Sequence, residues 1–206
     1  MQSKTTAIIA GVVLLAALVA LWLQSGISQP NIKGSPFQTL GQVLAEEAAK
    51  AIQDHGQVVA VPIDPHGQSS AIWQEQWAAF TDELKKHPSI TLAAPEFTDL
   101  DRPIPLADFL QQHAQAGVIV FFVDPQSWND LDSVPNPQTA PKIVAVGNPD
   151  LPAKTVYTRF FTSGILAALI LPHPLSSYQV EPKSQREWFA KYYSLFTRQN
   201  YESLPP

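Results

Sequence analysis

The stretch Gly164–Pro174, GILAALILPHP, decides the fold, because it is the second strongly apolar run in the chain after residues 7–23. A second membrane span would make the protein a two-pass membrane protein, whereas a buried strand would make it a tethered soluble domain. Ile165–Leu171 is far shorter than the roughly 20 residues that a transmembrane helix needs. Its length and the bounding Gly164 and Pro172 are typical of a buried strand. The sequence therefore predicts a core strand.

The composition fits a single globular domain with little affinity for nucleic acid. The chain has 206 residues, of which 45% are hydrophobic, which is enough for one domain with a core. A formal net charge of -5 and the lack of Lys/Arg clusters argue against a nucleic-acid partner, which needs a cationic face. The absence of cysteine excludes disulfides, thiolate metal ligands and a cysteine nucleophile.

The apolar run at residues 7–23 follows Lys4 and is predicted to direct the chain to a membrane. An uncleaved anchor would cross most of the hydrocarbon core and place Trp22 at the interface. A cleaved signal peptide is the alternative, with Gly26 and Ser28 as small residues before the cut. Either interpretation places the remainder outside the cytoplasm, in the periplasm, anchored in the inner membrane or secreted if the signal is cleaved.

Helices and strands are expected to alternate through the rest of the chain. Helices are predicted at 37–55, 71–86 and 106–116, and strands at 57–63, 90–97, 117–123 and 142–146. The strands are continuous apolar runs, as in a parallel sheet that is covered on both faces. The fold class predicted is α/β, a single doubly wound, mainly parallel, Rossmann-like sheet after an N-terminal membrane helix. The division expected is a signal anchor or signal peptide at 1–28, a linker at 29–36, the α/β domain at 37–180, and a C-terminal helix and tail at 181–206.

Candidate ligand-binding residues cluster where strands end, because open parallel sheets bind ligands outside the carboxyl ends of their strands. Acids and amides there would bond to hydroxyl groups, and tryptophans would stack on a ring. The residues predicted are Asp64, His66, Trp73, Gln76, Asp124, Trp128, Asn148 and Asp150. Each type of residue also has a purely structural interpretation. The acids would cap turns or loops, and the histidine would belong to a turn. The tryptophans would pack in the core, and the glutamine would lie on a solvated helix face.

Catalytic and metal-binding motifs are missing from the sequence. The five histidines show no metal-ligand spacing. The Asp99-Leu100-Asp101 triplet reads best as a helix N-cap region before Pro103. There is no G-x-S-x-G, Walker A or G-x-G-x-x-G pattern. We therefore expect no enzyme, no metal and no cofactor.

Five segments, taken in order, resemble the C-terminal lobe of type I periplasmic binding proteins, the sugar-binding kind that serve ABC transporters. They are TLGQVLAEEAAKAIQDHGQVVAVPI at 39–63, WAAFTDELKKHPSITLAAPEF at 77–97, AGVIVFFVD at 116–124, KIVAVGNPDLP at 142–152 and TSGILAALILPHP at 162–174. Residues 186–205 resemble a terminal helix and tail. The resemblance covers Leu40–Pro174, and implies that the family's N-terminal lobe is absent and that the membrane anchor stands in its place.

Several positions that carry polar chemistry in the family differ in this sequence. Gln76 stands where the family usually has an arginine, and Ala79 stands where the family has a glycine three residues later. The family's Asn-Asp pair is Val123-Asp124, so that only the acid is kept. The acid of the G-F-D pattern falls on Pro149, with Asp150 one position later. These departures imply a degenerate ligand site.

The function expected is therefore a non-catalytic, membrane-tethered extracytoplasmic binding module, with a small polar solute such as a sugar as the ligand class that the resemblance implies. A single lobe offers half a cleft, so a homodimer partner or another protein would supply the missing lobe. The alternative is a structural or protein-interaction module that kept the fold and lost the small ligand. Ligand identity, oligomeric state and the packing of residues 147–175 without a second lobe stay open.

Overall fold

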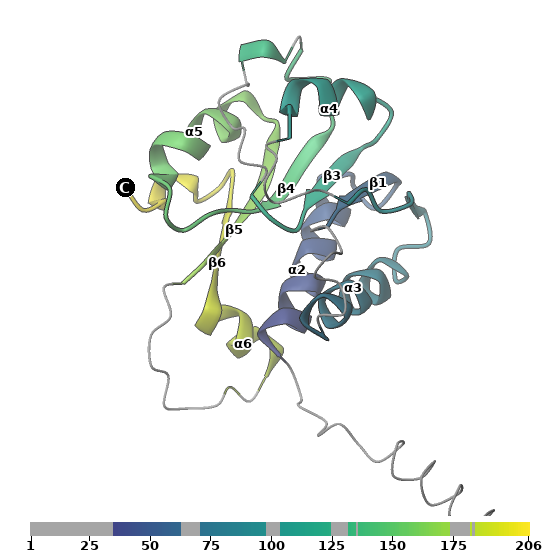
Figure 1. The fold of residues 1–206 in the computed structure, drawn as a ribbon, viewed down its shortest axis with the longest axis vertical. Coiled ribbons are helices and arrows are strands. Elements are labelled where there is room, and N and C mark those ends of the chain that lie inside the picture. Colours follow the sequence, from purple (N-terminus) through teal and green to yellow (C-terminus); the bar gives the residue numbers. More distant parts are fainter. Residues whose placement is uncertain are drawn as a thin grey trace, which may run out of the picture. The chain divides into compact units, whose positions relative to one another are not determined.

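A computed structural model gives the fold of the second of two compact units into which the chain divides, Met1–Lys33 and Gly34–Pro206 (Figure 1). The apolar run at 7–23 lies outside the residues described. Within the described part of the chain, no helix combines the length and hydropathy that crossing a membrane requires. The structure describes residues 35–62, 71–97, 104–124, 132–134, 136–173, 182 and 184–206.

One sheet of six strands forms the centre of this unit, in the order β2-β1-β3-β4-β5-β6. The first five strands in sequence run parallel, and β6 pairs antiparallel with β5. This arrangement confirms the prediction of a mainly parallel sheet, and GILAALILPHP contains one of its strands. The bounds are Gly56–Val61 for β1, Ile90–Leu92 for β2, Val118–Phe121 for β3, Lys142–Val146 for β4, Leu166–Pro172 for β5 and Tyr193–Thr197 for β6.

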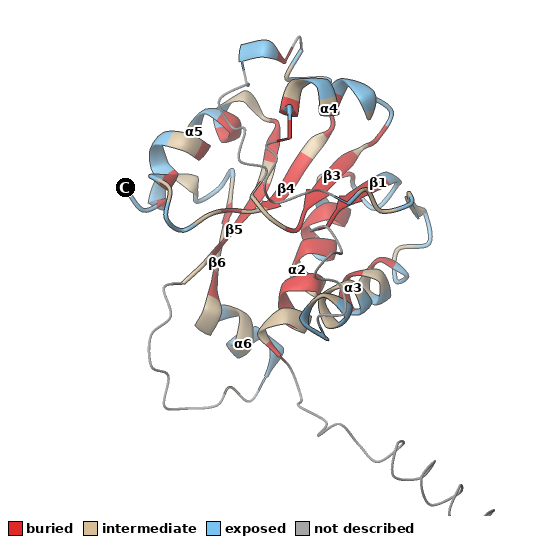
Figure 2. Ribbon diagram, in the orientation of Figure 1, coloured by how far each residue is buried: buried red, intermediate tan, exposed pale blue. Residues whose placement is uncertain are grey.

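Helices cover both faces of the sheet, as the doubly wound prediction requires (Figure 1). Alternate residues of each strand pack toward opposite faces: Val58 joins one buried cluster and Val59 the other. Figure 2 shows the buried residues concentrated in the strands and on α2. One face carries α2 (Pro36–Ala51), α3 (Ala71–Leu84) and α6 (Gln185–Tyr192); the other carries α4 (Leu106–Gln112), α5 (Ala153–Ser163) and the 3-10 helix η3 (Tyr201–Ser203).

Helix α2 begins and ends through identifiable local chemistry. The Ser35 Oγ accepts a hydrogen bond from the Gln38 backbone N at 3.0 Å, which caps the first turn. The helix ends at Ala51, earlier than predicted, because Gln53 and Asp54 adopt left-handed backbone angles, with φ of 53° and 61°. Gly56, which lies between the predicted helix at 37–55 and the predicted strand at 57–63, is the first residue of β1.

Helices α2 and α3 approach each other closely at Gly41. A Cβ atom built on Gly41 would lie 2.2 Å from the carbonyl oxygen of Gln76, well inside van der Waals contact. The absence of a side chain therefore sets the spacing of the two helices. This close approach places the first turns of α3 against α2.

Two segments near the C-terminus differ from the sequence expectation. Residues 153–163, for which no helix was predicted, form α5 as the crossover between β4 and β5. The helix expected within 181–206 is limited to α6, and Tyr193–Thr197 then enters the sheet as β6. Strand β2 is also shorter than the predicted 90–97. Beyond Leu92 the chain keeps isolated hydrogen bonds to β1, from the backbone N of Ala93 to the Val58 carbonyl and from that of Glu96 to the Ala60 carbonyl.

Candidate functional site

Three polar groups meet where β3 and β4 end, and we call them the Asp124 knot: Asp124, Asn148 and Tyr157. The Tyr157 hydroxyl donates to Asp124 Oδ2 at 2.5 Å. The backbone N of Asn148 approaches both Asp124 Oδ2 and the Tyr157 hydroxyl oxygen, at 3.1 Å each. A Cβ atom on Gly147 would lie 2.9 Å from that hydroxyl, so glycine leaves the room that the knot needs.

The electrostatics of the knot keep the tyrosine protonated. Tyr157 is fully buried on the inner side of α5. Burial, and then the charge of Asp124, raise the pKa of the Tyr157 phenol well above its usual value near 10. The hydroxyl therefore acts as a hydrogen-bond donor at neutral pH. Oδ2 of Asp124 accepts hydrogen bonds from the Tyr157 hydroxyl and the Asn148 backbone N. These bonds favour the interpretation of Asp124 as a loop-capping residue over its interpretation as a ligand acceptor.

An aromatic cluster lies at the same edge of the sheet, in the segments that follow β1, β2 and β3. The Trp73 ring centroid lies 5.2 Å from that of Trp77 and 5.8 Å from that of Phe122, which directly follows β3. Phe97, beyond β2, meets Trp73 edge-on at 6.1 Å, and Phe80 packs under Trp77 and Phe122. Trp73 is therefore packed against other rings, yet it is only half-buried. Such a ring retains surface on which an apolar or sugar face could stack.

Two large apolar side chains near this cluster are exposed to solvent. Ile72 and Phe97 each expose 48% of their surface, the only large hydrophobic residues so exposed among those described. Exposed apolar side chains do not contribute to a hydrophobic core. Where they lie close together, they are typical of a binding surface. The carboxyl edge thus combines a polar knot with an apolar patch, which we define as Ile72, Trp73 and Phe97.

The remaining predicted site residues divide into two groups. Asp64, His66 and Trp128 lie outside the described residues. Gln76 is half-buried on α3, with its carbonyl against Gly41 of α2, while Asp150 is exposed. The Asp150 backbone N donates to Asn148 Oδ1 at 2.9 Å, which forms a local turn. The structure therefore brings Asp124, Asn148 and Asp150 together, and it places Trp73 and Gln76 on α3.

Sequence reasoning missed Tyr157, Ile72 and Phe97. Tyr157 had an available signal, because Tyr157, Phe160 and Phe161 are spaced as one apolar face of a helix. The exposure of Ile72 and Phe97 has no signal in the sequence, since isolated apolar residues occur equally in cores. Among the residues described, no group of three or more His, Cys, Asp or Glu side chains is arranged to hold a metal ion.

No protein-family model matches the sequence, and a comparison with curated proteins finds no match. Solved structures do match by fold. An ABC transporter solute-binding protein from Burkholderia graminis, in complex with D-arabinose, has a TM-score of 0.57 at 17% identity, covering 84% of this chain and 63% of that one. One from Agrobacterium vitis, bound to α-D-tagatopyranose, has a TM-score of 0.54 at 19% identity, with 82% and 59% covered.

A third match is the sugar-binding protein of a sugar ABC transporter from Bacillus halodurans, with a TM-score of 0.53 at 16% identity, covering 82% of this chain and 64% of that chain. The chain thus spans about 60% of the length of these neighbours. This coverage fits a single lobe, and the matches confirm the resemblance drawn from the order of the sequence segments. At these identities the likeness defines a fold, that of sugar ABC transporter solute-binding proteins.

Proposed function

We propose that the chain is a non-catalytic, membrane-tethered extracytoplasmic binding module that recognises a sugar or similar polar solute at the carboxyl edge of its sheet. The observation that carries this proposal is the half-buried Trp73 ring, held by Trp77 and Phe122 at that edge. A fixed aromatic face suits the apolar face of a pyranose. The solved neighbours, which bind D-arabinose and tagatose, supply the ligand class.

The site proposed is degenerate on its polar side. Asp124 holds the family's acid position, but its Oδ2 accepts from Tyr157 and from the Asn148 backbone. Polar selectivity in a buried site comes from groups that would lose about 1–3 kcal/mol if left unpaired by the wrong ligand. A carboxylate that is already hydrogen-bonded supplies less of this selectivity. We therefore expect weak affinity and broad choice among sugars.

A titration of the full chain tests this function. D-Arabinose, D-tagatose and D-fructose are added at millimolar concentration, and intrinsic tryptophan fluorescence and thermal unfolding are both recorded. A sugar at 100 times its Kd raises the free energy of unfolding by about 2.7 kcal/mol. The response should vanish in Trp73→Leu and persist in Trp188→Phe, a matched control on α6. A wild-type chain that unfolds cooperatively but responds to none of these sugars contradicts the proposal.

A second candidate function, a protein-interaction module, is favoured by one observation: Ile72 and Phe97 are exposed, whereas Oδ2 of Asp124 is already hydrogen-bonded within the chain. The simplest partner is a second copy of the chain, since closed homo-oligomers are the commonest assemblies. Sedimentation velocity should then show a dimer that the Ile72→Ser, Phe97→Ser double variant dissociates. A monomer at all concentrations would remove this candidate.

A further inference from the structure

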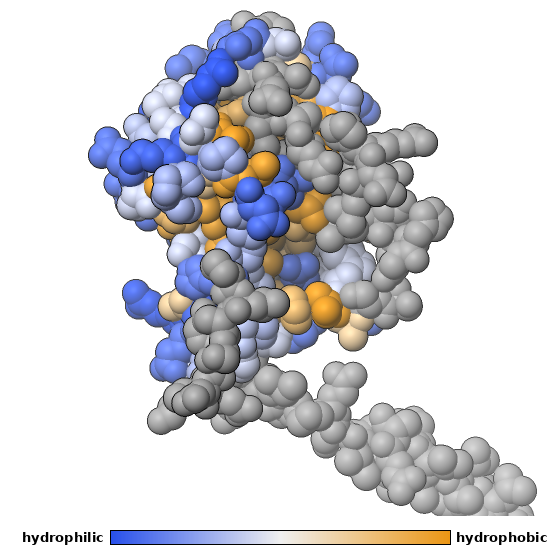
Figure 3. Space-filling view, turned by 60° about the vertical axis from the view of Figure 1, so that its left-hand side comes forward, coloured by the Kyte–Doolittle hydropathy of each residue, from blue (hydrophilic) through white to orange (hydrophobic). Residues whose placement is uncertain are grey.

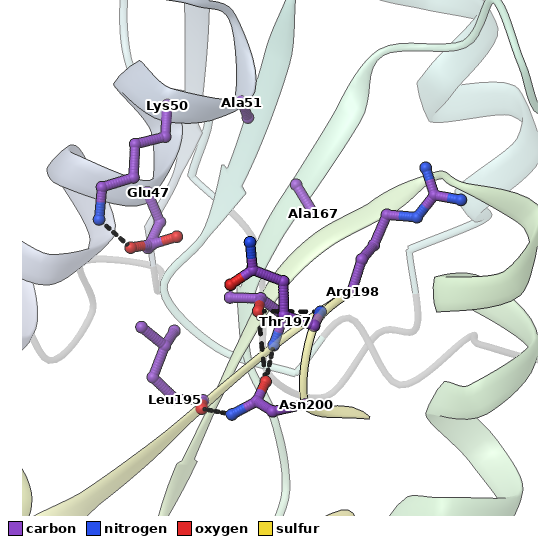
Figure 4. Close-up of a pocket in the computed structure, with 9 residues that line it drawn as sticks. Glu47, Lys50, Ala51, Ala167, Leu195, Thr197, Arg198 and Asn200 are labelled. Carbon is purple, nitrogen blue, oxygen red and sulfur yellow. Dashed lines mark hydrogen bonds and ion pairs between the residues drawn. The ribbon is translucent and has the colours of Figure 1, made fainter. Parts of the chain in front are cut away.

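A hollow of about 560 Å³ opens at the opposite edge of the sheet, where the parallel strands begin (Figure 4). The last turn of α2 forms one wall, and the end of β6 with the turn after it forms the other. Between them lies the start of β5, at Ala167. The volume falls within the range of about 300–1,000 Å³ that is usual for small-molecule sites. This hollow is separate from the carboxyl edge that carries the Asp124 knot and Trp73.

Glu47 brings a nearly buried carboxylate to the α2 wall. Its side chain is only 9% exposed, and its Oε1 lies 2.6 Å from Lys50 Nζ. Within the part of the chain that the structure describes, Glu47 Oε2 has no hydrogen-bond partner. Figure 4 shows Lys50 approaching the carboxylate from one side, with the other oxygen turned toward Ala167 and the β6 wall. Because donors on both oxygens stabilise a carboxylate that is withdrawn from water, Oε2 is an open acceptor inside the hollow.

The charge on the α2 wall favours a positively charged ligand. Two carboxylates, those of Glu46 and Glu47, precede the single ammonium group of Lys50 by about one helical turn. The hydrogen bond to Glu47 raises the pKa of Lys50, burial partly offsets this effect, and the charge of Glu46 adds to it. The Lys50 side chain is 65% exposed, so water screens its repulsion of a second cation. A ligand ammonium group would neutralise the negative charge that remains on this wall.

The β6 wall is an ordered turn that places no cation opposite Glu47. Asn200 Oδ1 accepts from the Thr197 backbone N at 2.6 Å, and Asn200 Nδ2 donates to the Leu195 carbonyl at 2.9 Å. Among the described residues that line the hollow, Arg198 is the one cation on this wall. Figure 4 shows its guanidinium pointing away from Glu47. The acceptor at Oε2 is therefore left to a ligand.

The apolar part of the lining is aliphatic. Ala51, Ala167 and Leu195 contribute it, from α2, β5 and β6. The face of the molecule that Figure 3 shows is likewise mixed, with hydrophobic residues lying among hydrophilic ones. An aliphatic surface beside an open carboxylate oxygen suits a ligand that has a hydrocarbon body and a positively charged N–H donor at one end.

We propose that this hollow binds a small aliphatic primary amine in its protonated form, with the ammonium group on Glu47 Oε2 and the hydrocarbon part on Ala51, Ala167 and Leu195. The ligand and Lys50 would share the carboxylate, one on each oxygen. Charge-assisted hydrogen bonds of this kind are roughly twice as strong as neutral ones. The aliphatic surface favours an alkylamine over an inorganic cation. This site is independent of the sugar site proposed at the carboxyl edge.

Saturation-transfer NMR of butylamine with the full chain, at pH 7 and constant ionic strength, tests this proposal. The amine is protonated at this pH, as a lysine side chain is. 1-Butanol is the neutral analogue of the same length, and ammonium chloride is the competitor without a hydrocarbon part. We expect butylamine to bind, 1-butanol to bind about tenfold more weakly, and ammonium to displace butylamine poorly.

Three variants on α2 locate the bound amine. Glu47→Gln keeps the size of the side chain and should raise the butylamine Kd by about tenfold or more. Glu46→Gln is the matched control: it removes the same charge from an exposed neighbour outside the lining and should change the Kd by about twofold or less. Lys50→Met removes the ammonium group that shares Glu47 and should lower the Kd. Trp73→Leu at the carboxyl edge should leave the Kd unchanged.

Several results would overturn the proposal. One is an absence of butylamine binding by the folded wild-type chain. Equal changes of the Kd in Glu47→Gln and Glu46→Gln would show a general charge effect, and equal affinity for 1-butanol would show that the carboxylate recognises nothing. Displacement by ammonium as strong as by butylamine itself would show that the aliphatic surface selects nothing. If Glu47→Gln does not fold, Lys50→Met at its exposed position still decides, because a raised Kd in that variant would place the amine away from Glu47.

Discussion

Replacement of Tyr157 by phenylalanine removes the donor of the Asp124 knot and keeps the buried ring. The hydroxyl that is lost donates to Asp124 Oδ2 at 2.5 Å, whereas the Asn148 backbone N still reaches the same oxygen at 3.1 Å. Hydrogen bonds to charged groups contribute about 1.5–3 kcal/mol, and no cavity the size of a ring is created. The free energy of unfolding should therefore fall by about 2 kcal/mol at pH 7.

The pH dependence of this loss has a definite sign. Burial raises the pKa of Tyr157 in the folded state above the value near 10 of the unfolded chain. Below pH 10 both states are protonated, and the contribution is fully present. Above pH 10 the unfolded state ionises first, so the wild type loses stability at up to about 1.4 kcal/mol per pH unit until the folded pKa is reached. The phenylalanine variant has no such loss at this position, so the difference between the two proteins should shrink to below about 1 kcal/mol by pH 11.

Urea unfolding of the full chain, followed by far-ultraviolet circular dichroism at pH 7, 9, 10 and 11, measures both effects. Tyr201→Phe serves as the control, because Tyr201 stacks on Phe161 with ring centroids 5.3 Å apart on the same side of the sheet. It should cost less stability at pH 7 than Tyr157→Phe. A Tyr157→Phe variant that is as stable as wild type at pH 7, or a difference that stays constant to pH 11, would refute the reasoning about the knot.

Other predictions concern glycines and a helix cap. Gly41→Ala should lower the urea midpoint although alanine favours helices, because its Cβ would lie 2.2 Å from the Gln76 carbonyl oxygen. Gly164 ends α5 with φ of 79°, and a Cβ added there would make only an ordinary contact, 3.9 Å from Arg198 Nη1. Gly164→Ala should therefore cost about 1 kcal/mol of unfolding free energy and Gly164→Asn less; equal costs would contradict a purely backbone effect. Ser35→Ala should cost about 1 kcal/mol through the lost cap, and Ser35→Asp should restore it in thermal unfolding.

The sheet could be predicted from the sequence because most of its parallel strands are buried on both faces. Strands such as Val118–Phe121 and Lys142–Val146 read as continuous apolar runs, and turn residues bound them. Helix α5 was not predicted, because the segments that carry the resemblance, at 142–152 and 162–174, lie on either side of most of it. Strand β6 was missed because its tyrosine and phenylalanine continue the apolar spacing of α6, so the point where helix changes to strand has no local signal.

The site could be predicted only in part, for a different reason. Asp124 and Asn148 follow buried strands directly, so their place at the carboxyl edge follows from topology. Their hydrogen bonds do not, because Tyr157 reaches them from a helix whose crossover geometry fixes the distance. The hollow near Arg198 could not be predicted at all, since it depends on the antiparallel return of β6 beside β5.

That antiparallel return has a consequence for solubility. Strand β5 is highly apolar, and β6 occupies its outer edge from Ala168, opposite Thr197, to Pro172, opposite Tyr193. Unpaired backbone groups along a flat apolar strand recruit strands from other molecules. A proteolytic cut between β5 and β6 would leave β6 attached by non-covalent contacts alone, and its departure would turn a stable domain into a template for aggregation.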